Sequence, residues 1–360
     1  MKSFCLQTKI ISGTGAVQEL KKLGAKKLMV VSDPFFAKNG MAQTIAGYAE
    51  AEEIQIFSQV IPDPSVALVA EGTSALKAFC PDTVVALGGG SAMDCAKAMV
   101  YFSGLHPKLV AIPTTSGSGS EVTDFSILTH EGIKHPLVDP ILSPQVAILD
   151  DSLLGQLPKS LIADGGFDVL AHALEAYVAK NASPITDALA KDAFCTAYGS
   201  LPASYAGHQE VRLRLHTAST MAGMAFTQAG LGMCHALSHV LGGMYHIPHG
   251  RLNAILLPAV ISCNAHRAGE KYACLARAAG LGGSADVVAL RNLKNGLIRL
   301  RKELSLPATL AQAGISPYQL RQDMKAIVHG ALQDACCETN PMEVEDFMLY
   351  RVLEEVTGSV

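Results

Sequence analysis

Short apolar runs in the first half of the chain alternate with longer stretches of helical periodicity. The runs cover residues 27–32, 83–87 and 108–112, and the helical stretches include Gly40–Ala51 and Val66–Phe79. Strands that are apolar at every position are buried on both faces, as in parallel sheets covered by helices on both sides. The pattern therefore predicts an α/β domain with a parallel, Rossmann-like sheet, to which we assign residues 1–155.

From about residue 155 the strand pattern gives way to helical periodicity. The candidate helices are Leu189–Tyr198, Arg212–Phe226, Lys271–Ala279, Ala289–Leu304 and Met342–Glu355. We therefore expect an all-α second domain over residues 156–360, and the chain length itself favours two domains.

Composition excludes several classes of protein. Only 17% of the 360 residues are charged, so we expect part of the surface to be buried in a homodimer or larger homo-oligomer. The formal net charge is −4, which argues against a nucleic-acid partner. No apolar stretch reaches the roughly 18 residues of a transmembrane helix, which argues against a membrane partner. The first residues lack the pattern of a signal peptide, and nine scattered cysteines fit reduced thiols, so we expect a cytoplasmic protein.

Residues suited to a dinucleotide follow the apolar runs. Gly88–Ser91 follows the second run, where glycines let the backbone approach a pyrophosphate and the next helix offers its N-terminus. The Thr/Ser/Gly-rich loop 114–120 follows the third run and adds hydroxyl and amide donors. A triple glycine alone also fits a simple tight turn, so the prediction depends on the two loops together.

Asp33 directly follows the first apolar run. An acid at this position accepts hydrogen bonds from ribose hydroxyls and repels a 2′-phosphate, which favours NAD over NADP. The same residue also fits a helix cap or a turn, and the sequence leaves both interpretations open.

Four of the twelve histidines lie within the fifteen residues from His235 to His249. His235 and His239 are four residues apart and share one face of a helix. We expect Gly242-Gly243 to end that helix, and the turn at Pro248–Gly250 to return another imidazole to the same place. Such a cluster predicts a transition-metal site, the alternative being a helix with solvated or core histidines.

Asp168 and His172 form a second pair with this spacing. We expect a helix to open at Asp168, after Gly165-Gly166, so that a carboxylate and an imidazole complete the site with His235 and His249. The alternative makes Asp168 a partner of the helix dipole and His172 a core residue.

Several motifs, spread over nearly the whole chain, are specific in combination. They are G-G-G-S-x-x-D-x-x-K at Gly88–Lys97, P-T-T-S-G-S-G-S-E-V-T at Pro113–Thr123, D-V-L-A-H-A-L-E-A-Y at Asp168–Tyr177 and G-L-G-M-C-H-A-L-S-H…P-H-G at Gly230–Gly250. Together they resemble the iron-containing (group III) alcohol dehydrogenases, which share a dehydroquinate-synthase-like architecture. The segments Leu6–Lys9, Pro62–Ser65 and Thr339–Pro341 resemble family members of propanediol-degrading bacterial microcompartments.

The resemblance implies an NAD(H)-linked, iron(II) (Fe2+) alcohol dehydrogenase. Its substrates would be short-chain primary alcohols and aldehydes, such as 1-propanol and propionaldehyde or ethanol and acetaldehyde. It would lie in the cytoplasm, inside a microcompartment with shell or enzyme partners.

Residue by residue, the resemblance assigns the metal to Asp168, His172, His235 and His249, with His239 beside it as a catalytic residue that does not bind the metal. The dinucleotide residues that it implies are Asp33, Gly89, Gly90, Ser91, Asp94, Lys97, Thr114, Thr115, Ser118 and Lys134. Ser118 stands where the family commonly has threonine, and because the hydroxyl is kept we expect cofactor binding to persist.

Three alternative functions remain open. One aspartate and three histidines also suit zinc (Zn2+), which leaves a zinc-dependent glycerol- or lactaldehyde-type polyol dehydrogenase. A metal-dependent lyase similar to dehydroquinate synthase needs basic residues for a phosphorylated substrate, and between residues 230 and 251 only Arg251 is basic. A catalytically silent assembly protein is disfavoured by the intact set of ligands.

Overall fold

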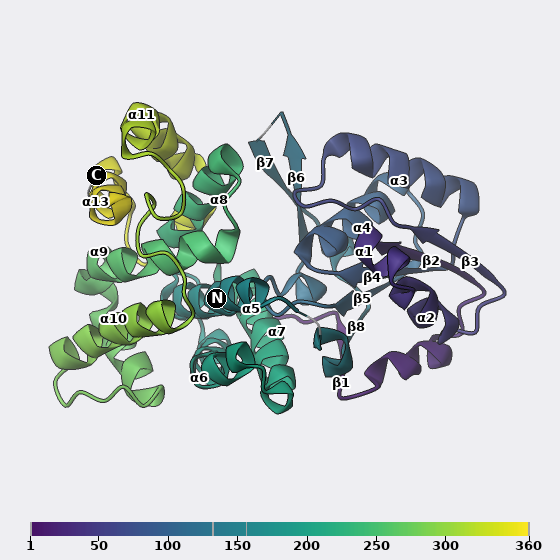
Figure 1. Ribbon diagram of the computed structural model, residues 1–360, viewed down its shortest axis with the longest axis horizontal. Coiled ribbons are helices and arrows are strands. Elements are labelled where there is room, and N and C mark those ends of the chain that lie inside the picture. Colours follow the sequence, from purple (N-terminus) through teal and green to yellow (C-terminus); the bar gives the residue numbers. More distant parts are fainter. Residues whose placement is uncertain (1, 132, 156, 359–360) are drawn as a thin grey trace. The chain divides into compact units, whose positions relative to one another are not determined.

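The computed structural model describes residues 2–131, 133–155 and 157–358 and divides them into two compact units (Figure 1). The α/β unit is the continuous stretch Leu6–Leu157, and the helical unit combines Pro158–Val360 with the first five residues. The boundary predicted from the sequence falls on residue 156, which lies outside the described residues.

A six-stranded sheet in the order β1-β8-β5-β4-β2-β3 forms the centre of the α/β unit, and β6 and β7 form a separate antiparallel pair. All strand pairs of the large sheet are parallel. The strands are β1 (Lys9–Ser12), β2 (Lys27–Ser32), β3 (Glu53–Phe57), β4 (Thr83–Gly88), β5 (Lys108–Pro113), β6 (Phe125–His130), β7 (Ile133–Val138) and β8 (Val146–Leu149). The three predicted strands are β2, β4 and β5; the pattern does not predict the others.

Alternate residues of the central strands enter two different hydrophobic cores. Met29 and Val31 of β2 pack in the core that contains residues of α3 and α4, whereas Leu28 and Val30 pack with residues of η1 and α2. Burial on both faces is why these strands are apolar at every position. The helices of this unit are η1 (Ala16–Leu23), α1 (Pro34–Lys38), α2 (Met41–Gly47), α3 (Val66–Phe79), α4 (Gly90–Ser103), η2 (Ser120–Val122), η3 (Pro140–Leu142) and η4 (Asp151–Leu154).

The direction in which strands are added reverses between β2 and β4. From β2 the chain moves outward to the edge strand β3 and then returns to β4 on the other side of β2. Open α/β sheets bind ligands beyond the carboxyl ends of the strands at such a point. Asp33 follows β2, and Gly89 and Gly90 follow β4, so these predicted dinucleotide residues lie at the reversal.

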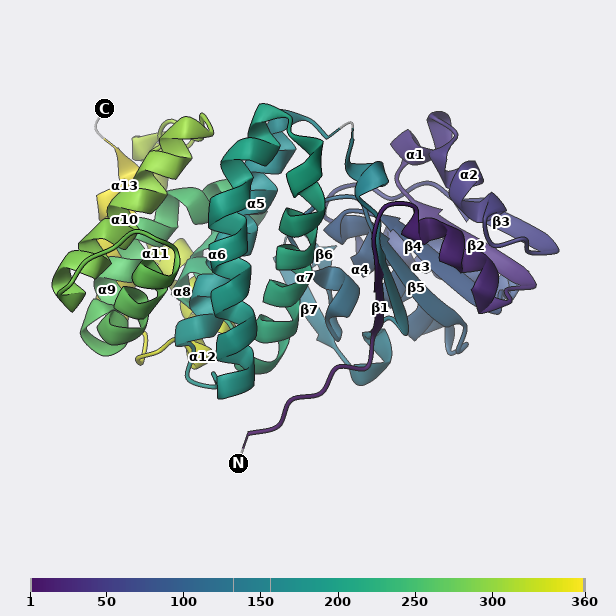
Figure 2. The same ribbon diagram turned by 90° about the horizontal axis from the view of Figure 1, so that it is seen from below.

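The helical unit contains no strand among its described residues, and Figure 2 shows α5, α6 and α7 side by side. The fold class predicted from the sequence, a parallel α/β unit followed by an all-α unit, is therefore confirmed. The helices are α5 (Lys159–Val178), α6 (Pro184–Ala206), η5 (Gln209–Val211), α7 (Arg212–Ala229), α8 (Met233–Tyr245), α9 (His249–Ala278), α10 (Asp286–Glu303), α11 (Pro317–Gln333), α12 (Cys336–Thr339) and α13 (Asp346–Thr357).

Two predicted helix boundaries near the histidines are wrong, and at the first of them the glycine serves packing. Asp168 lies inside α5 rather than at its start. Gly166 is also inside α5, where a Cβ would lie 2.2 Å from Cδ1 of Leu201 on α6. The second boundary is also displaced: α8 continues through Gly242-Gly243 to Tyr245 and is followed by His246, which adopts a left-handed conformation with φ 55°.

Further boundaries differ from the prediction. His249 is the first residue of α9 and not part of a loop, and the predicted helix 271–279 is the last part of that long helix. The predicted helix 40–51 is confined to α2, and the predicted helix 342–355 begins only at Asp346, in α13.

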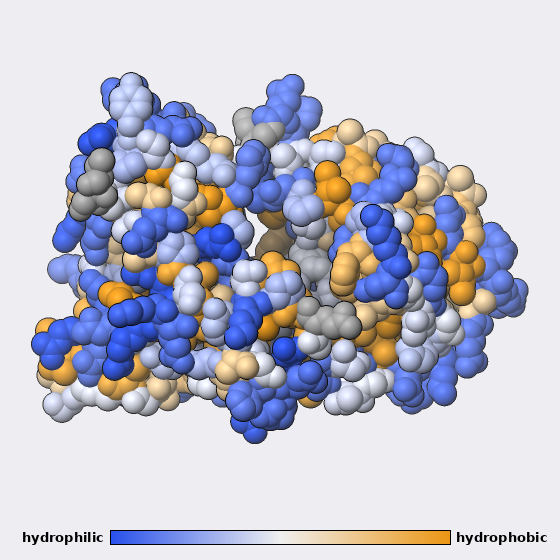
Figure 3. Space-filling model, in the orientation of Figure 1, coloured by the Kyte–Doolittle hydropathy of each residue, from blue (hydrophilic) through white to orange (hydrophobic). Residues whose placement is uncertain are grey.

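The first residues of the chain are bound to the helical unit. Lys2 Nζ donates to the carbonyl oxygens of Lys180 and Ala182, and Gln228 Nε2 donates to the carbonyl oxygen of Cys5 over 3.4 Å. Both units also expose apolar side chains among hydrophilic ones (Figure 3). Among the described residues we find no helix with both the length and the hydrophobicity that a membrane span requires.

Candidate functional site

One face of α5 carries Asp168, His172 and Glu175, because residues spaced by four and three positions lie above one another on a helix. All three side chains are buried. Sequence analysis identifies the first two as candidate ligands but misses Glu175, although it lies within the same motif.

His235 of α8 and His249 of α9 meet this face. The donor atoms of Asp168, His172 and His235 all lie within 4.8 Å of one another. His249 Nδ1 is 2.8 Å from Asp168 Oδ1, and His235 Nε2 is 4.0 Å from the same oxygen. The structure thus brings together the four residues that the resemblance implies as metal ligands, drawn from three helices.

The protonation states in this cluster suit a cation. Burial raises the pKa of Asp168, but His172 and His249 outweigh it and lower that pKa to about 2, so the carboxylate is charged. Burial and the neighbouring imidazoles keep the pKa of His235 well below its usual value, so its ring is neutral. A charged carboxylate and a neutral imidazole, as in Asp168 and His235, are the forms that bind metals.

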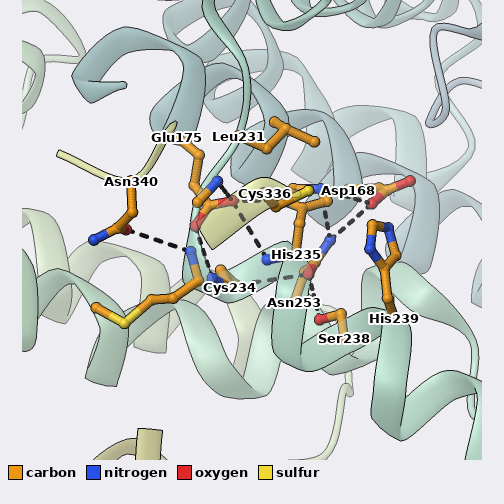
Figure 4. Close-up of polar contacts among 12 residues, drawn as sticks. Asp168, Glu175, Leu231, Cys234, His235, Ser238, His239, Asn253, Cys336 and Asn340 are labelled. Carbon is orange, nitrogen blue, oxygen red and sulfur yellow. Dashed lines mark hydrogen bonds and ion pairs between the residues drawn. The ribbon is translucent and has the colours of Figure 1, made fainter. Parts of the chain in front are cut away.

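Glu175 fixes the orientation of His235 (Figure 4). Its carboxylate accepts hydrogen bonds from His235 Nδ1 over 2.6 Å and from the main-chain nitrogens of Gly232 and Cys234 over 2.9 and 2.8 Å. Burial raises the pKa of Glu175 to about 7, and hydrogen bonds from the main-chain nitrogens of Cys234, Gly232 and His235 act against this shift. With Nδ1 bound to Glu175, it is Nε2 of His235 that is left to face Asp168.

The two glycines before His235 make room for this arrangement. A Cβ on Gly232 would lie 2.7 Å from Glu175 Oε1 and 2.9 Å from Asn340 Oδ1, and one on Gly230 would lie 2.4 Å from Thr339 Oγ1. Met233 N donates to Asn340 Oδ1 over 3.3 Å. The G-L-G motif and the distant T-N-P motif therefore shape the same site.

Gly250 allows α9 to begin against α5. A Cβ there would lie 1.8 Å from the carbonyl oxygen of Asp164, which leaves room for glycine alone. Beside it, Arg251 holds the Asp164 carboxylate with bonds of 3.2 and 2.9 Å. These contacts place His249 over Asp168.

Asn253 connects the three helices. Its Nδ2 donates to Asp168 Oδ1 over 2.8 Å, and its Oδ1 accepts from Ser238 Oγ over 2.6 Å (Figure 4). The side chain is fully buried. Asn253 lies one helical turn after His249, a spacing that could have indicated its position once α9 was known to start there.

His239 lies beside the cluster but makes its hydrogen bond elsewhere. Its ring centroid is 6.2 Å from that of His235 and 5.2 Å from that of His249. Its Nδ1 is 2.8 Å from Asp334 Oδ2, and the donor atoms of these two residues and Cys336 lie within 4.8 Å of one another. Sequence analysis names His239 but not Asp334.

The predicted dinucleotide loops adjoin each other in the α/β unit. Thr114 N donates to Gly88 O over 2.9 Å. A Cβ on Gly89 would lie 3.2 Å from Thr115 Oγ1, and one on Gly90 would lie 3.2 Å from Ser118 Oγ. The glycines thus let the start of α4, where Ser91 is the second residue, approach the hydroxyl-rich loop closely.

Asp33 caps α1. Its Oδ1 accepts hydrogen bonds from Phe35 N over 2.8 Å and from Phe36 N over 3.3 Å. Its Oδ2 lies 3.8 Å from where a Cβ on Gly88 would be, so the carboxylate also borders the glycine loop. The cap that the sequence left open is present, and contact with a ribose stays a prediction.

Lys97, Asp94 and Lys134 already have protein partners. Lys97 is buried and donates to Ser120 Oγ, Thr123 O and Oγ1, and Phe125 O over 2.9–3.1 Å. Asp94 Oδ1 accepts from Ser120 Oγ over 3.0 Å, and Lys134 pairs with Asp63 over 2.7 Å. In this structure Lys97 and Asp94 hold the hydroxyl-rich loop in place, and their contact with a dinucleotide stays a prediction.

Comparison with known proteins places both units in one family. The model of the iron-containing alcohol dehydrogenases matches residues 7–151, and the model of the C-terminal part of that family matches residues 162–356. The 1-propanol dehydrogenase PduQ of Citrobacter freundii is 41% identical over 99% of this chain and 100% of the relative. This chain belongs to the iron-containing alcohol dehydrogenase family.

Two further comparisons bear on the cofactor. The NADPH-dependent butanol dehydrogenase of Clostridium saccharobutylicum is 37% identical over 98% of this chain and 97% of the relative. A sulfoacetaldehyde reductase from Bifidobacterium kashiwanohense, solved in complex with NAD+, has a TM-score of 0.90 and 26% identity, with full coverage of both chains.

The family resemblance stated from the motifs is thus confirmed, and the chain is an alcohol dehydrogenase of the iron-containing type. The alternative of a zinc-dependent polyol dehydrogenase is not favoured, since the matched family is defined by iron and the similar proteins include propanol and butanol dehydrogenases.

Proposed function

We propose that the protein interconverts short-chain primary alcohols and aldehydes, such as 1-propanol and propionaldehyde or ethanol and acetaldehyde, with iron(II) and NAD(H). The observation that supports this most is the convergence of Asp168, His172, His235 and His249 in a chain 41% identical to a 1-propanol dehydrogenase. The residues fit the metal, since in the described part of the chain His249 Nε2 is buried without a hydrogen-bond partner.

In this proposal Asp168, His172, His235 and His249 hold the metal, and Glu175 and Asn253 orient them. When bound, the metal polarises the substrate oxygen and the nicotinamide exchanges hydride with the carbinol carbon. His239 lies beside the ligands with one ring nitrogen bound to Asp334. We assign His239 the transfer of the hydroxyl proton.

The dinucleotide would bind where the direction of strand addition reverses, between β2 and β4. Gly89, Gly90 and Ser91 offer the N-terminus of α4 to the pyrophosphate, and Thr114, Thr115 and Ser118 offer hydroxyls beside it. Asp33 borders this loop with a carboxylate that disfavours a 2′-phosphate, which supports NAD over NADP. Asp94 and Lys97 would act by holding the loop, and Lys134 completes the set implied by the family.

We further propose a cytoplasmic homo-oligomer that is enclosed in a bacterial microcompartment with shell or enzyme partners. The enclosure rests on the resemblance of Leu6–Lys9, Pro62–Ser65 and Thr339–Pro341 to microcompartment members of the family. The oligomer rests on the low share of charged residues and on exposed apolar side chains such as Val287 and Tyr318.

The test is metal analysis of protein purified without oxygen, combined with NADH and NADPH oxidation across a panel of aldehydes. We expect one iron per chain, faster turnover with NADH, and the highest kcat/KM for aldehydes of two to four carbons. Protein that binds no iron, or that reduces no member of the panel with either dinucleotide, contradicts the proposal.

A further inference from the structure

His239 and Asp334 form a hydrogen-bonded pair beside the ligand cluster. His239 belongs to α8, and Asp334 follows the last residue of α11. Nδ1 and Oδ2 are 2.8 Å apart, and the two side chains are 25% and 20% exposed. The pair is therefore partly buried, and the ring centroid of His239 lies 5.2 Å from that of His249.

The main chain fixes the Asp334 carboxylate independently of His239. Its Oδ1 accepts a hydrogen bond of 2.9 Å from Cys336 N, and Asp334 N donates to Ala331 O over 3.2 Å. Burial raises the pKa of Asp334, but the bond with His239 outweighs this and holds that pKa at about 2. The carboxylate is thus ionised and accepts hydrogen bonds on both oxygens.

This arrangement determines which ring nitrogen of His239 carries the proton. An ionised carboxylate can only accept, so the nitrogen that faces it must donate. Nδ1 of neutral His239 therefore carries the hydrogen, and Nε2 on the other edge presents its lone pair.

We propose that Asp334 is a positioning residue that locks His239 in the Nδ1-protonated tautomer, so that Nε2 exchanges the substrate's hydroxyl proton. The inference rests on the proposed function. In alcohol oxidation the hydroxyl proton passes to Nε2 while the carbinol hydride passes to NAD+, which gives aldehyde, NADH and an imidazolium that then loses a proton to solvent. Aldehyde reduction runs these transfers in reverse.

Asp334→Asn is a sharp test because of the second hydrogen bond. Asparagine has one acceptor oxygen and one donating amide group. The main-chain nitrogen of Cys336 can only donate, so it requires the side-chain oxygen of the asparagine as its acceptor. The NH2 group of the asparagine then faces His239. The imidazole must then accept at Nδ1 and carry its proton on Nε2, where it can no longer take one from the alcohol.

Asp323→Asn is the matched control. Asp323 lies on α11, the helix that Asp334 follows, and like Asp334 it accepts a hydrogen bond from an α8 side chain, over 2.8 Å from Tyr245 Oη. Because the tyrosine hydroxyl can bond to either an oxygen or an amide, this variant loses a charge without imposing a tautomer. Metal content, kcat and KM would be measured for both variants and for wild type. The protonated ring nitrogen of His239 would be identified from its 15N signals in zinc-substituted enzyme. These signals are assigned by their loss in His239→Ala.

For Asp334→Asn we expect unchanged metal content, a kcat at least about tenfold lower, a KM changed less than kcat, and an Nε2-protonated His239. Asp323→Asn should match wild type. The double variant His239→Ala/Asp334→Asn should have a kcat within about twofold of that of His239→Ala, because Asp334 acts through His239. An unchanged tautomer, or an inverted tautomer with full kcat, overturns the inference even if the wild-type enzyme is active. Failure of the proposed function would appear separately, as wild-type protein without iron or turnover.

Discussion

Glu175 Oε2 and His235 Nδ1 are 2.6 Å apart, and both side chains are buried. The carboxylate therefore orients the imidazole and makes it a stronger ligand, as outer carboxylates do in other metal sites. The Glu175 carboxylate also accepts from the main-chain nitrogens of Gly232, just before α8, and Cys234, within it, so one residue helps to set both the start of that helix and the direction of its histidine.

Glu175→Gln should weaken metal binding roughly 10–100-fold, the usual effect of losing such a partner. Glutamine offers one acceptor where several donors converge, so the His235 ring loses its fixed orientation. Affinity is measured by competition with a chelator, and circular dichroism checks the fold. The exposed Glu338→Gln should behave as wild type. Wild-type affinity in Glu175→Gln contradicts the assigned role.

His249→Ala should lose metal and turnover while dinucleotide binding persists. Since His249 is the first residue of α9, alanine leaves the helix intact. His239→Ala should instead keep the metal and lower kcat by roughly 10²-fold or more. Metal content, turnover and NADH fluorescence are measured on both. If His249→Ala retains metal and His239→Ala loses it, the ligand set must be reassigned.

Gly250→Ala should lower the free energy of unfolding by roughly 2–4 kcal/mol and displace His249 from the metal, because the new Cβ meets the carbonyl of Asp164. Gly269→Ala, in the same helix with open space around it, should raise that free energy by about 0.5–1 kcal/mol. Urea unfolding and metal content distinguish the two. Equal stabilities would mean that α9 does not pack on α5 as described.

Asp33→Ser should reduce discrimination against NADP by roughly 1–3 kcal/mol, the scale of a charged hydrogen bond. Serine keeps the cap of α1, so the change removes the charge without unwinding the helix. The measurement is the ratio of kcat/KM for NADH to that for NADPH. A wild-type enzyme that prefers NADPH, like the butanol dehydrogenase relative, would remove Asp33 from this role.

The central strands were predictable because their environment is the same on both faces. Leu28 to Val31 and Val84 to Leu87 are buried at every position, which leaves an unbroken apolar run. The four-residue strands β1 and β8 are too short to stand out, and β7 carries Lys134 and Pro136. These strands are specified by their neighbours in the sheet and not by their own sequence.

The candidate ligands were predictable from residue type and family motifs, whereas their supports were not. Glu175 accepts from main-chain donors on another helix, and Asp334 binds a histidine far away in sequence. Local sequence patterns do not predict contacts between residues so far apart in the chain. The predicted helix start after Gly165-Gly166 is wrong for the same reason. Gly166 makes room for a side chain of α6, and the sequence alone does not distinguish such a glycine from one that interrupts a helix.

The attachment of the first five residues to the helical unit matters for protein engineering. The α/β unit is an insertion, entered after Cys5 and left after Leu157, so transplanting it into a homologue requires two junctions. A chimera that exchanges residues 6–157 keeps Lys2 with its own partners at Lys180 and Ala182. A chimera that exchanges everything up to residue 157 would join a foreign N-terminus to the native helices and lose the hydrogen bonds of Lys2 with Lys180 and Ala182.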